Sequence, residues 1–234
     1  MEQKYIVLQQ SNKKKKRSIG LRILDVLFCL YIIVALCYLI FCSIFIQAKV
    51  IGTSMQPTFN ENLIYGEDIY KSKYKDVVYA NRFDKGTNGD IVIVKLGDEV
   101  VIKRLIATQG QVLTLKYESD GFYHFYLAKE VGDVPQKLNE SYIGNFVVNM
   151  NYGYYLRFLD IKGVEEDGMI TGSSASIVIP EGQVFLLGDN RETSQDSTTY
   201  GPISKNNILG TVKFHHKYNQ NLLGYLWNQF CSIF

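Results

Sequence analysis

The sequence predicts a mostly β fold that is preceded by one transmembrane helix near the N-terminus. Two patterns support this prediction: an apolar run without charge over residues 26–46, and short β-branched runs with a period of two beyond Lys49. The chain has 234 residues, of which 47% are hydrophobic and 21% are charged, and this composition excludes global disorder. Its length allows one compact domain with an appendage, or two small domains.

The N-terminal segment, residues 1–25, is strongly basic. It holds seven lysine and arginine residues, five of them in the KKKKR run at residues 13–17, against two acidic residues. The net charge of the whole chain is only +2, so the remainder has more acidic than basic residues. Because such a body has no basic excess to neutralise phosphates, the sequence argues against nucleic acid as a partner.

Residues 26–46 are expected to form the transmembrane helix. A helix of 21 residues is about 31 Å long, which is enough to cross the hydrocarbon core of a bilayer. A cleavable signal peptide would have a shorter apolar run, of about 7–15 residues, followed by a small-x-small motif. A buried core helix is the other alternative, and so apolar a helix is rare in a small domain. The run is therefore expected to anchor the chain in membrane lipid.

The distribution of lysine and arginine predicts the orientation of this anchor. The KKKKR run and Arg22 precede the span, whereas only Lys49 follows it closely. The positive-inside rule then makes residues 1–25 a cytoplasmic segment and residues 47–234 an extracytoplasmic domain of a single-pass cell-membrane protein. The KKKKR run is expected to contact anionic lipid.

The body is expected to be a β barrel or sandwich, with no helical periodicity outside the anchor. A hairpin is predicted over residues 90–96 and 100–107, and further strands over residues 111–117, 121–128, 176–180 and 184–189. Residues 118–179 are rich in Tyr, Asn, Gly and Asp with weak periodicity, which indicates a variable insertion or small subdomain. The apolar tail, residues 221–234, is too short to span a bilayer and is expected to lie at the membrane interface.

Cysteine and histidine predict no cross-link or metal site in the body. The four cysteines stand at positions 29, 37, 42 and 231, so residues 50–230 contain none and a disulfide framework there is excluded. The histidines at 124, 215 and 216 do not show zinc-ligand spacing with acidic partners.

A serine that could act as a nucleophile stands in the motif VIGTSMQPTFN at residues 50–60. Small residues precede Ser54, and Pro57 after it removes a ladder donor and helps to end the strand, so the hydroxyl could be exposed. Serine is common in turns, and an ordinary turn is the alternative for this motif alone.

Lys103 lies in a predicted strand, VVIKRLIA at residues 100–107. Alternation puts Val101, Lys103 and Leu105 on one face of that strand. Burial between apolar neighbours would lower the pKa of the lysine, and a neutral amine can accept the proton of a serine hydroxyl. The commoner alternative is an edge-strand lysine that extends to solvent.

Four motifs, in this order and behind an N-terminal anchor, resemble those of the bacterial type I signal peptidases, a serine/lysine dyad family. They are GTSMQPTF around Ser54, GDIVIVK at residues 89–95, VIKRLIATQG around Lys103, and GDNRETSQDS at residues 188–197. Taken alone, the last motif would be an ordinary polar loop. Residues 118–179 lie outside the resemblance.

The resemblance implies a signal-peptidase-like β catalytic core without metal or cofactor. It implies Ser54 as the nucleophile and Lys103 as the general base, with Ser194 orienting the lysine amine. The residues expected to support the site are Asp189, Asn190, Asp196 and Arg104, and Arg104 is expected to form an ion pair with Asp196.

Two positions depart from the family pattern. Some members have a serine two positions before the nucleophile, where this chain has Gly52, so an oxyanion hole would rest on backbone N–H groups, chiefly that of Ser54. The family often continues the last motif as Asp-Ser-Arg, where this chain has Thr198. The missing arginine predicts a less rigid loop around Asp196.

The implied activity is membrane-bound removal of N-terminal signal peptides from exported preproteins, with cleavage after small residues at −3 and −1. Ser54 lies eight residues past the predicted span, within about 26 Å of its end if the link is extended. A preprotein is expected to add as a β-strand between residues 49–53 and the strand of Lys103. The expected substrate-binding residues are Ile51, Gly52, Thr53, Met55, Val101 and Leu105, with Ile51, Val101 and Leu105 as apolar walls.

Two other functions remain open on the sequence. One is a non-catalytic or specialised signal-peptidase-like factor for the assembly of surface polymers such as pili; retention of both Ser54 and Lys103 argues against it. The other is a membrane-anchored β receptor without chemistry, which leaves Lys103 and Ser194 unexplained. The sequence predicts neither the particular preproteins nor the oligomeric state.

Overall fold

A computed structural model describes residues 19–61, 75–166 and 174–217 of the chain. They form two compact units, one that ends at Ser43 and one that begins at Ile44. The KKKKR run and the apolar tail at residues 221–234 lie outside the described residues.

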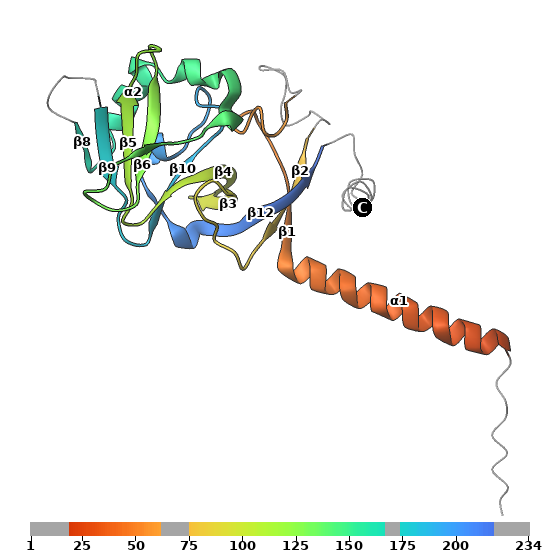
Figure 1. The fold of residues 1–234 in the computed structure, drawn as a ribbon. Helices are drawn as coiled ribbons and strands as arrows, with labels where there is room; N and C mark the ends of the chain where they lie inside the picture. The colour runs from red at the N-terminus through yellow and green to blue at the C-terminus, as the bar shows by residue number, and fades with distance from the viewer. Residues whose placement is uncertain (1–18, 62–74, 167–173, 218–234) are drawn as a thin grey trace, which may run out of the picture. The chain divides into compact units, whose positions relative to one another are not determined.

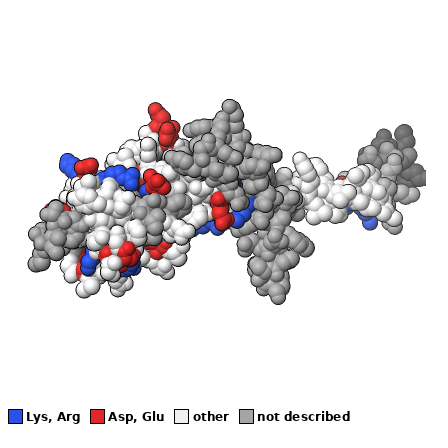
Figure 2. All heavy atoms as spheres, turned by 90° about the horizontal axis from the view of Figure 1, so that it is seen from above, with Lys and Arg blue, Asp and Glu red and all other residues white. Residues whose placement is uncertain are grey.

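The described part of the first unit is helix α1, Ile19–Ile44, without its last residue, and by length and composition this helix could cross a membrane. Its surface is almost entirely uncharged, and only Arg22 and Asp25 interrupt it (Figure 2). The helix begins seven residues before the predicted span and ends two residues before its end. Phe45 and Ile46 instead begin strand β1, because they pair with Asn81 and Ala80 of a neighbouring strand.

The larger sheet of the second unit has seven strands in the order β1-β2-β12-β3-β4-β10-β11, and all of its paired neighbours are antiparallel. The predicted hairpin is confirmed as β3 and β4, joined by a turn in which Gly97 has a positive φ of 60°. The bounds of the strands are Phe45–Lys49 (β1), Val77–Asn81 (β2), Ile91–Leu96 (β3), Glu99–Thr108 (β4), Gln183–Leu187 (β10), Ile203–Ser204 (β11) and Ile208–His216 (β12).

A second sheet of five strands has the order β7-β6-β5-β9-β8 (Figure 1). It begins at Val112, six residues before the predicted insertion, because β5 pairs with β6 and β9 rather than with the larger sheet. The bounds are Val112–Tyr117 (β5), Tyr123–Ala128 (β6), Gln136–Lys137 (β7), Val164–Glu166 (β8) and Ser174–Val178 (β9). The strands predicted at 111–117, 121–128 and 176–180 are thereby confirmed, and they form a sheet of their own.

The expectation of no helix outside the anchor is wrong. Helix α2, Tyr152–Leu159, is capped by the side chain of Asn151, which accepts from the Tyr154 N–H. Its sequence, YGYYLRFL, is rich in aromatic residues of modest helix propensity, so tertiary packing of Tyr154, Tyr155 and Phe158 stabilises it. Three further helical segments occur among the described residues: the 3-10 helices η1 (Ser141–Asn149) and η2 (Lys205–Asn207), and the short helix α3 (Ser197–Tyr200).

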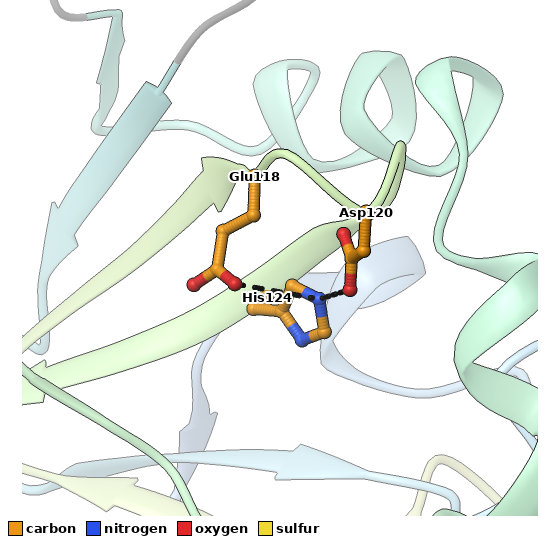
Figure 3. A group of neighbouring side chains, drawn as sticks. All are labelled: Glu118, Asp120 and His124. Carbon is orange, nitrogen blue, oxygen red and sulfur yellow. Dashed lines mark hydrogen bonds and ion pairs between the residues drawn. The ribbon is translucent and has the colours of Figure 1, made fainter.

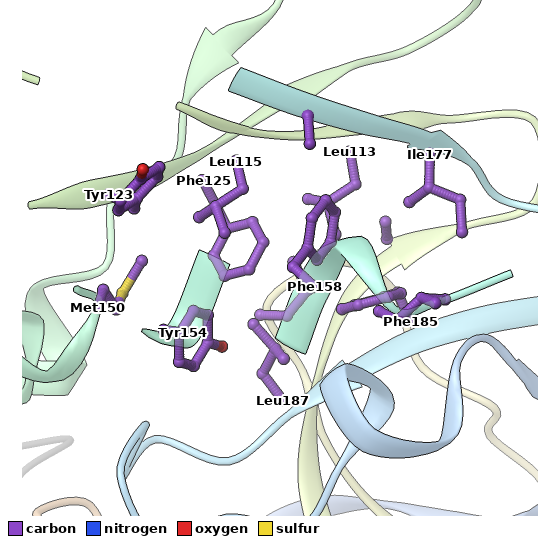
Figure 4. Packing of buried hydrophobic residues seen from close by; sticks show 14 of the residues in the cluster. Leu113, Leu115, Tyr123, Phe125, Met150, Tyr154, Phe158, Ile177, Phe185 and Leu187 are labelled. Carbon is purple, nitrogen blue, oxygen red and sulfur yellow. The ribbon is translucent and has the colours of Figure 1, made fainter. Parts of the chain in front are cut away.

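The largest apolar core joins the second sheet to strands β4 and β10 (Figure 4). Phe158 of α2 lies between Phe125 of β6 and Phe185 of β10, with edge-to-face ring contacts at centroid distances of 5.9 and 6.0 Å. Full burial of such a side chain contributes roughly 1.5–3 kcal/mol. The core therefore fixes the position of the two strands from which the candidate site is built.

Candidate active site

Ser54 lies in a turn that follows β1, between residues 50 and 60. The turn is closed by backbone bonds from Gln56 N to Thr53 O (3.0 Å) and from Phe59 N to Met55 O (2.9 Å). Gly52 has a φ of 90°, a conformation that favours glycine, and this permits the sharp change of direction before Ser54. The sequence prediction that the strand breaks here is confirmed.

Asn60 holds the extended segment in front of Ser54. Its side-chain amide donates to the carbonyls of Val50 (2.9 Å) and Gly52 (3.0 Å), and its Oδ1 accepts from the N–H of Asp76 (2.9 Å). Asn60 is buried and adopts a positive φ of 54°. Residues 50–52 are therefore fixed on one side of the site by a side chain that the sequence analysis did not single out.

Lys103 is buried in strand β4, opposite Val92 of β3, with 3% of its surface exposed. Desolvation by this burial lowers the pKa of the ammonium group, and the carboxylates of Asp196 and Asp189 partly oppose that shift. A lysine in this environment is more readily neutral than an exposed one, as a general base requires.

Gly188 lies where the segment after β10 meets both Ser54 and Ser194. A Cβ atom at this position would overlap the Ser194 hydroxyl and lie 2.5 Å from the Ser54 carbonyl oxygen. The Asn190 N–H also donates to that carbonyl, at 3.1 Å. The Oγ of Ser194 is buried and has no hydrogen-bond partner within the described part of the chain. Close packing that only glycine allows thus brings the two predicted serines together.

Arg104 forms its ion pair with Asp189, not with Asp196 as the sequence analysis expected. Its Nε and Nη2 donate to the two carboxylate oxygens of Asp189 at 2.8 and 2.6 Å. Thr58, from the turn that carries Ser54, donates to the same carboxylate at 2.5 Å. The guanidinium follows Lys103 in β4 and points to the opposite face, so it reaches the first carboxylate of the loop. This pair connects the lysine strand, the nucleophile turn and the loop after β10.

Asp196 instead organises its own loop through neutral donors. Its carboxylate accepts from the N–H groups of Gly188 (2.9 Å) and Thr198 (3.0 Å) and from the Thr198 hydroxyl (2.9 Å). It also caps the N-terminus of α3. Thr198, which stands where the family often has arginine, is buried and supplies two of these three bonds. The loop is held by this capping arrangement, so the expected loss of rigidity has a local compensation.

Ser54 and Lys103 both line a groove of about 810 Å³. Ile51, Gly52, Thr53 and Val101, predicted as substrate-binding residues, line it as well. A smaller cavity of about 130 Å³ is lined by Ser54, Lys103, Ile51, Val101 and Met55 among others. Residues of the larger groove that the sequence analysis did not name include Leu96, Glu99, Gln195, Tyr200 and Ile203.

Leu105 does not line either cavity, so its assignment as a wall is wrong. Its exposed fraction is 0%, and it packs in a core cluster with Val184, Leu186 and Ile208. Period-two alternation places Leu105 on the face of Lys103, but at this point of β4 the apolar side chains of the core cluster cover that face. Alternation predicts the face of a residue and not whether other side chains cover it.

Arg191 is a second residue that the sequence analysis missed, and 1% of its surface is exposed. Its Nε donates to the Gly188 carbonyl at 3.1 Å, and its guanidinium forms an ion pair with Glu140. Its position within GDNRETSQDS is the only sequence signal for it, because Glu140 is 51 residues away.

Outside the groove, His124 lies beside Glu118 and Asp120 (Figure 3), the one His/carboxylate group in the described ranges that could hold a metal ion. The sequence analysis found no zinc-ligand spacing of His124 with acidic residues and did not single out these two neighbours. Its Nε2 lies 2.7 Å from Asp120 Oδ2, while Glu118 accepts from Lys137 at 2.7 Å and from the Tyr126 hydroxyl. The group is an ion-pair network on the second sheet.

The sequence matches the family described as signal peptidase, peptidase S26, over residues 23–217. It is 33% identical to signal peptidase I V of Bacillus subtilis over 73% of this chain and 84% of that protein. It is 32% identical to signal peptidase I of Bacillus licheniformis over 78% of this chain and 82% of that protein. A crystal structure of a signal peptidase I from Enterococcus faecalis aligns with a TM-score of 0.35 and 26% identity, covering 56% of this chain and 98% of that one. By the family match and these identities, the chain belongs to the signal peptidase family, peptidase S26, and is an enzyme of the signal peptidase I kind.

Proposed function

We propose that the protein is a membrane-bound serine endopeptidase that removes N-terminal signal peptides from exported preproteins through a Ser54–Lys103 dyad. The observation that carries this proposal is the pairing of an accessible serine with a buried lysine in one groove. Burial lowers the pKa of Lys103, which favours the neutral amine that a general base needs. Relatives named signal peptidase I agree with this activity.

In the proposed reaction, Ser54 Oγ attacks the scissile carbonyl while Lys103 Nζ accepts its proton. The tetrahedral intermediate collapses to an acyl-enzyme, and Lys103 returns the proton to the leaving amine. Water, deprotonated by Lys103, then attacks the ester, and Lys103 gives that proton to Ser54 Oγ as the acyl C–O bond breaks. Ser194 is proposed to orient the lysine amine, a role supported by its buried hydroxyl without another partner among the described residues.

The oxyanion is proposed to bind backbone N–H groups, chiefly that of Ser54, because Gly52 offers no hydroxyl. Preorganised backbone donors of this kind stabilise the charge that develops in the transition state. The bond from Asn190 N to Ser54 O and the close approach of Gly188 support a fixed backbone at Ser54.

The preprotein is proposed to bind as an extended strand in the groove between residues 49–53 and β4. Alternate side chains of a strand point to the same side, so the −1 and −3 residues would face the wall while −2 would not. Ile51 and Val101 line both cavities and are the proposed apolar walls that admit only small side chains. Main-chain hydrogen bonds would supply most of the affinity.

The chain is proposed to be a single-pass protein with its N-terminus in the cytoplasm and its catalytic domain outside. The apolar α1 supports membrane anchoring, and the basic run before it supports the orientation. A catalytic domain in this position would meet preproteins as their cleavage sites leave the membrane.

The test is cleavage of a preprotein by the full chain in detergent or lipid, with the product N-terminus read by mass spectrometry. The wild type should cut once, after a small residue at −1, and Ser54→Ala should not cut at all. Ser204→Ala, which removes a hydroxyl of strand β11 from the same groove, is the matched control and should retain activity. No cleavage by wild type, or equal cleavage by Ser54→Ala, would reject the proposed function.

A further inference from the structure

Arg191 connects the loop after β10 to a segment of the second sheet region, residues 140–150. Its guanidinium is fully enclosed: Nε donates to Gly188 O at 3.1 Å, Nη1 to Met150 Sδ at 3.2 Å, and Nη2 pairs with Glu140. An arginine without solvent contact loses its hydration, so these fixed partners must replace water. The cation is thus built into the structure and bonded directly to the Gly188 carbonyl.

The same segment also contacts the other parts of the site. The Tyr142 hydroxyl donates to Glu140 at 3.1 Å, and its ring lies 3.8 Å from the guanidinium of Arg104. Arg104 in turn binds Asp189 and adjoins Lys103. Gly144 lies against Pro57: the Pro57 Cγ is 3.7 Å from the position that a Cβ atom on Gly144 would take. Residues 140–150 therefore contact the loop, the lysine strand and the nucleophile turn.

We propose that Arg191 and Glu140 act as a positioning pair, which holds the Gly188 backbone against Ser54 and Ser194. Through this pair, residues 140–150 of the second sheet region help to hold Ser54 and Ser194 in position. This inference rests on the proposed function. Neither side chain lines the groove, so both act through Gly188 and Arg104 and not on the substrate.

A buried ion pair of this kind fixes the positions of its partners more than it adds to the free energy of unfolding. Desolvation of two charges offsets much of their attraction, so a buried pair contributes little net stability compared with apolar residues of the same size. Its value is directional, because the guanidinium fork fixes three acceptors at once. Lysine at position 191 would keep the charge but could not reproduce that fork.

The test compares Arg191→Lys, Glu140→Gln and Tyr142→Phe with wild type in preprotein cleavage. We expect kcat to fall roughly 10-fold to 100-fold for Arg191→Lys, less for the other two, and KM to stay nearly unchanged. Desolvation is the largest cause of the lowered pKa of Lys103, and a displaced loop would admit water and relieve it. The acid limb of the kcat/KM profile should therefore move to higher pH, a shift that simple loss of folded protein cannot produce.

Two matched variants show what the same kinds of substitution, Glu to Gln and Arg to Lys, do at positions outside the proposed pair. Glu118→Gln breaks the exposed ion pair to Lys137 on the same sheet, and Arg157→Lys changes an exposed arginine of α2. Both should keep the wild-type kcat and pH profile. Thermal unfolding of each variant gives the folded fraction at the assay temperature, and rates are expressed per folded molecule.

The outcomes separate this inference from the proposed function. An inactive wild type would remove the function on which the inference rests. An active wild type with folded Arg191→Lys and Glu140→Gln variants of unchanged kcat and pH profile would overturn the positioning role alone. If Arg191→Lys does not fold, Glu140→Gln and Tyr142→Phe decide by the same criteria.

Discussion

At the scale of single residues, Lys103 is the proposed general base because its strand places it in a buried position. Burial disfavours its ammonium, whereas Asp196 and Asp189 favour it, and desolvation has the larger effect. The net result is a pKa below the ordinary lysine value of about 10.4. Since the base must be neutral, activity should rise with pH as Lys103 loses its proton.

This balance predicts how the pH profile responds to a change of charge. Asp196→Asn removes a carboxylate that stabilises the ammonium, so the acid limb of kcat/KM should move to lower pH, even if the weaker cap reduces kcat. Glu192→Gln, on the same loop but exposed, should leave the midpoint unchanged. Initial rates across pH with a preprotein substrate measure both. A shift of the Asp196→Asn profile to higher pH would contradict the assignment of Lys103 as the base.

The close packing around Gly188 leads to a second prediction at the residue scale. Gly188→Ala forces the loop away from Ser54 O and Ser194, because its Cβ has no space there. We expect a loss of about 1–3 kcal/mol of stability from overpacking and a larger fractional loss of kcat. Gly153→Ala, in α2, is the control, since its Cβ would meet only the Asn151 side chain, 3.2 Å from the Oδ1 atom that caps the helix. Wild-type turnover by Gly188→Ala would show that this close approach is unimportant.

At the scale of elements, the sequence predicts where strands form better than it predicts what packs against them. The β3–β4 hairpin and the strands at β5, β6, β9 and β10 follow from local alternation. Helix α2 does not, because packing of its aromatic face outweighs a weak local propensity. The same limit explains Leu105, which is on the predicted face but is buried in a core cluster.

The walls of the groove give a prediction that belongs to β4 and the segment before Ser54. Ile51→Ala or Val101→Ala should enlarge the space at the groove and relax the demand for small residues at −1 or −3, with −2 unaffected. Leu105→Ala should cost roughly 2–5 kcal/mol of stability by leaving a core cavity, without a change in selectivity. A peptide library varied at the three positions, together with thermal unfolding, measures both effects. Altered selectivity in Leu105→Ala alone would reverse the assignment of walls.

At the scale of the whole molecule, the candidate site depends on contacts between distant parts of the sequence. The motifs around Ser54 and Lys103 and the GDNRETSQDS motif indicate their chemistry through resemblance. The Arg104–Asp189 pair and the Arg191–Glu140 pair join residues 85 and 51 positions apart, and nothing local specifies such partners. The sequence therefore predicts the candidate catalytic residues more readily than the distant residues that hold them in position.

The membrane orientation is also a property of the whole chain. Protease added outside intact cells should digest the catalytic domain and spare residues 1–25, because the basic run is expected on the cytoplasmic side. Replacing the KKKKR run with neutral residues should weaken this preference. Mass spectrometry of the protected fragments is the measurement, and protection of the domain would contradict the proposed orientation.

The central claim is that Ser54 and Lys103 act as one unit, and Lys103→Arg tests it most directly. Arginine keeps the positive charge and much of the bulk of lysine, but it cannot lose its proton in a protein, so it cannot serve as the base. Preprotein cleavage should be almost abolished in Ser54→Ala, in Lys103→Arg and in the double variant, with the double variant little worse than either single one. Substantial cleavage by folded Lys103→Arg would mean that another group is the base, and would contradict the account.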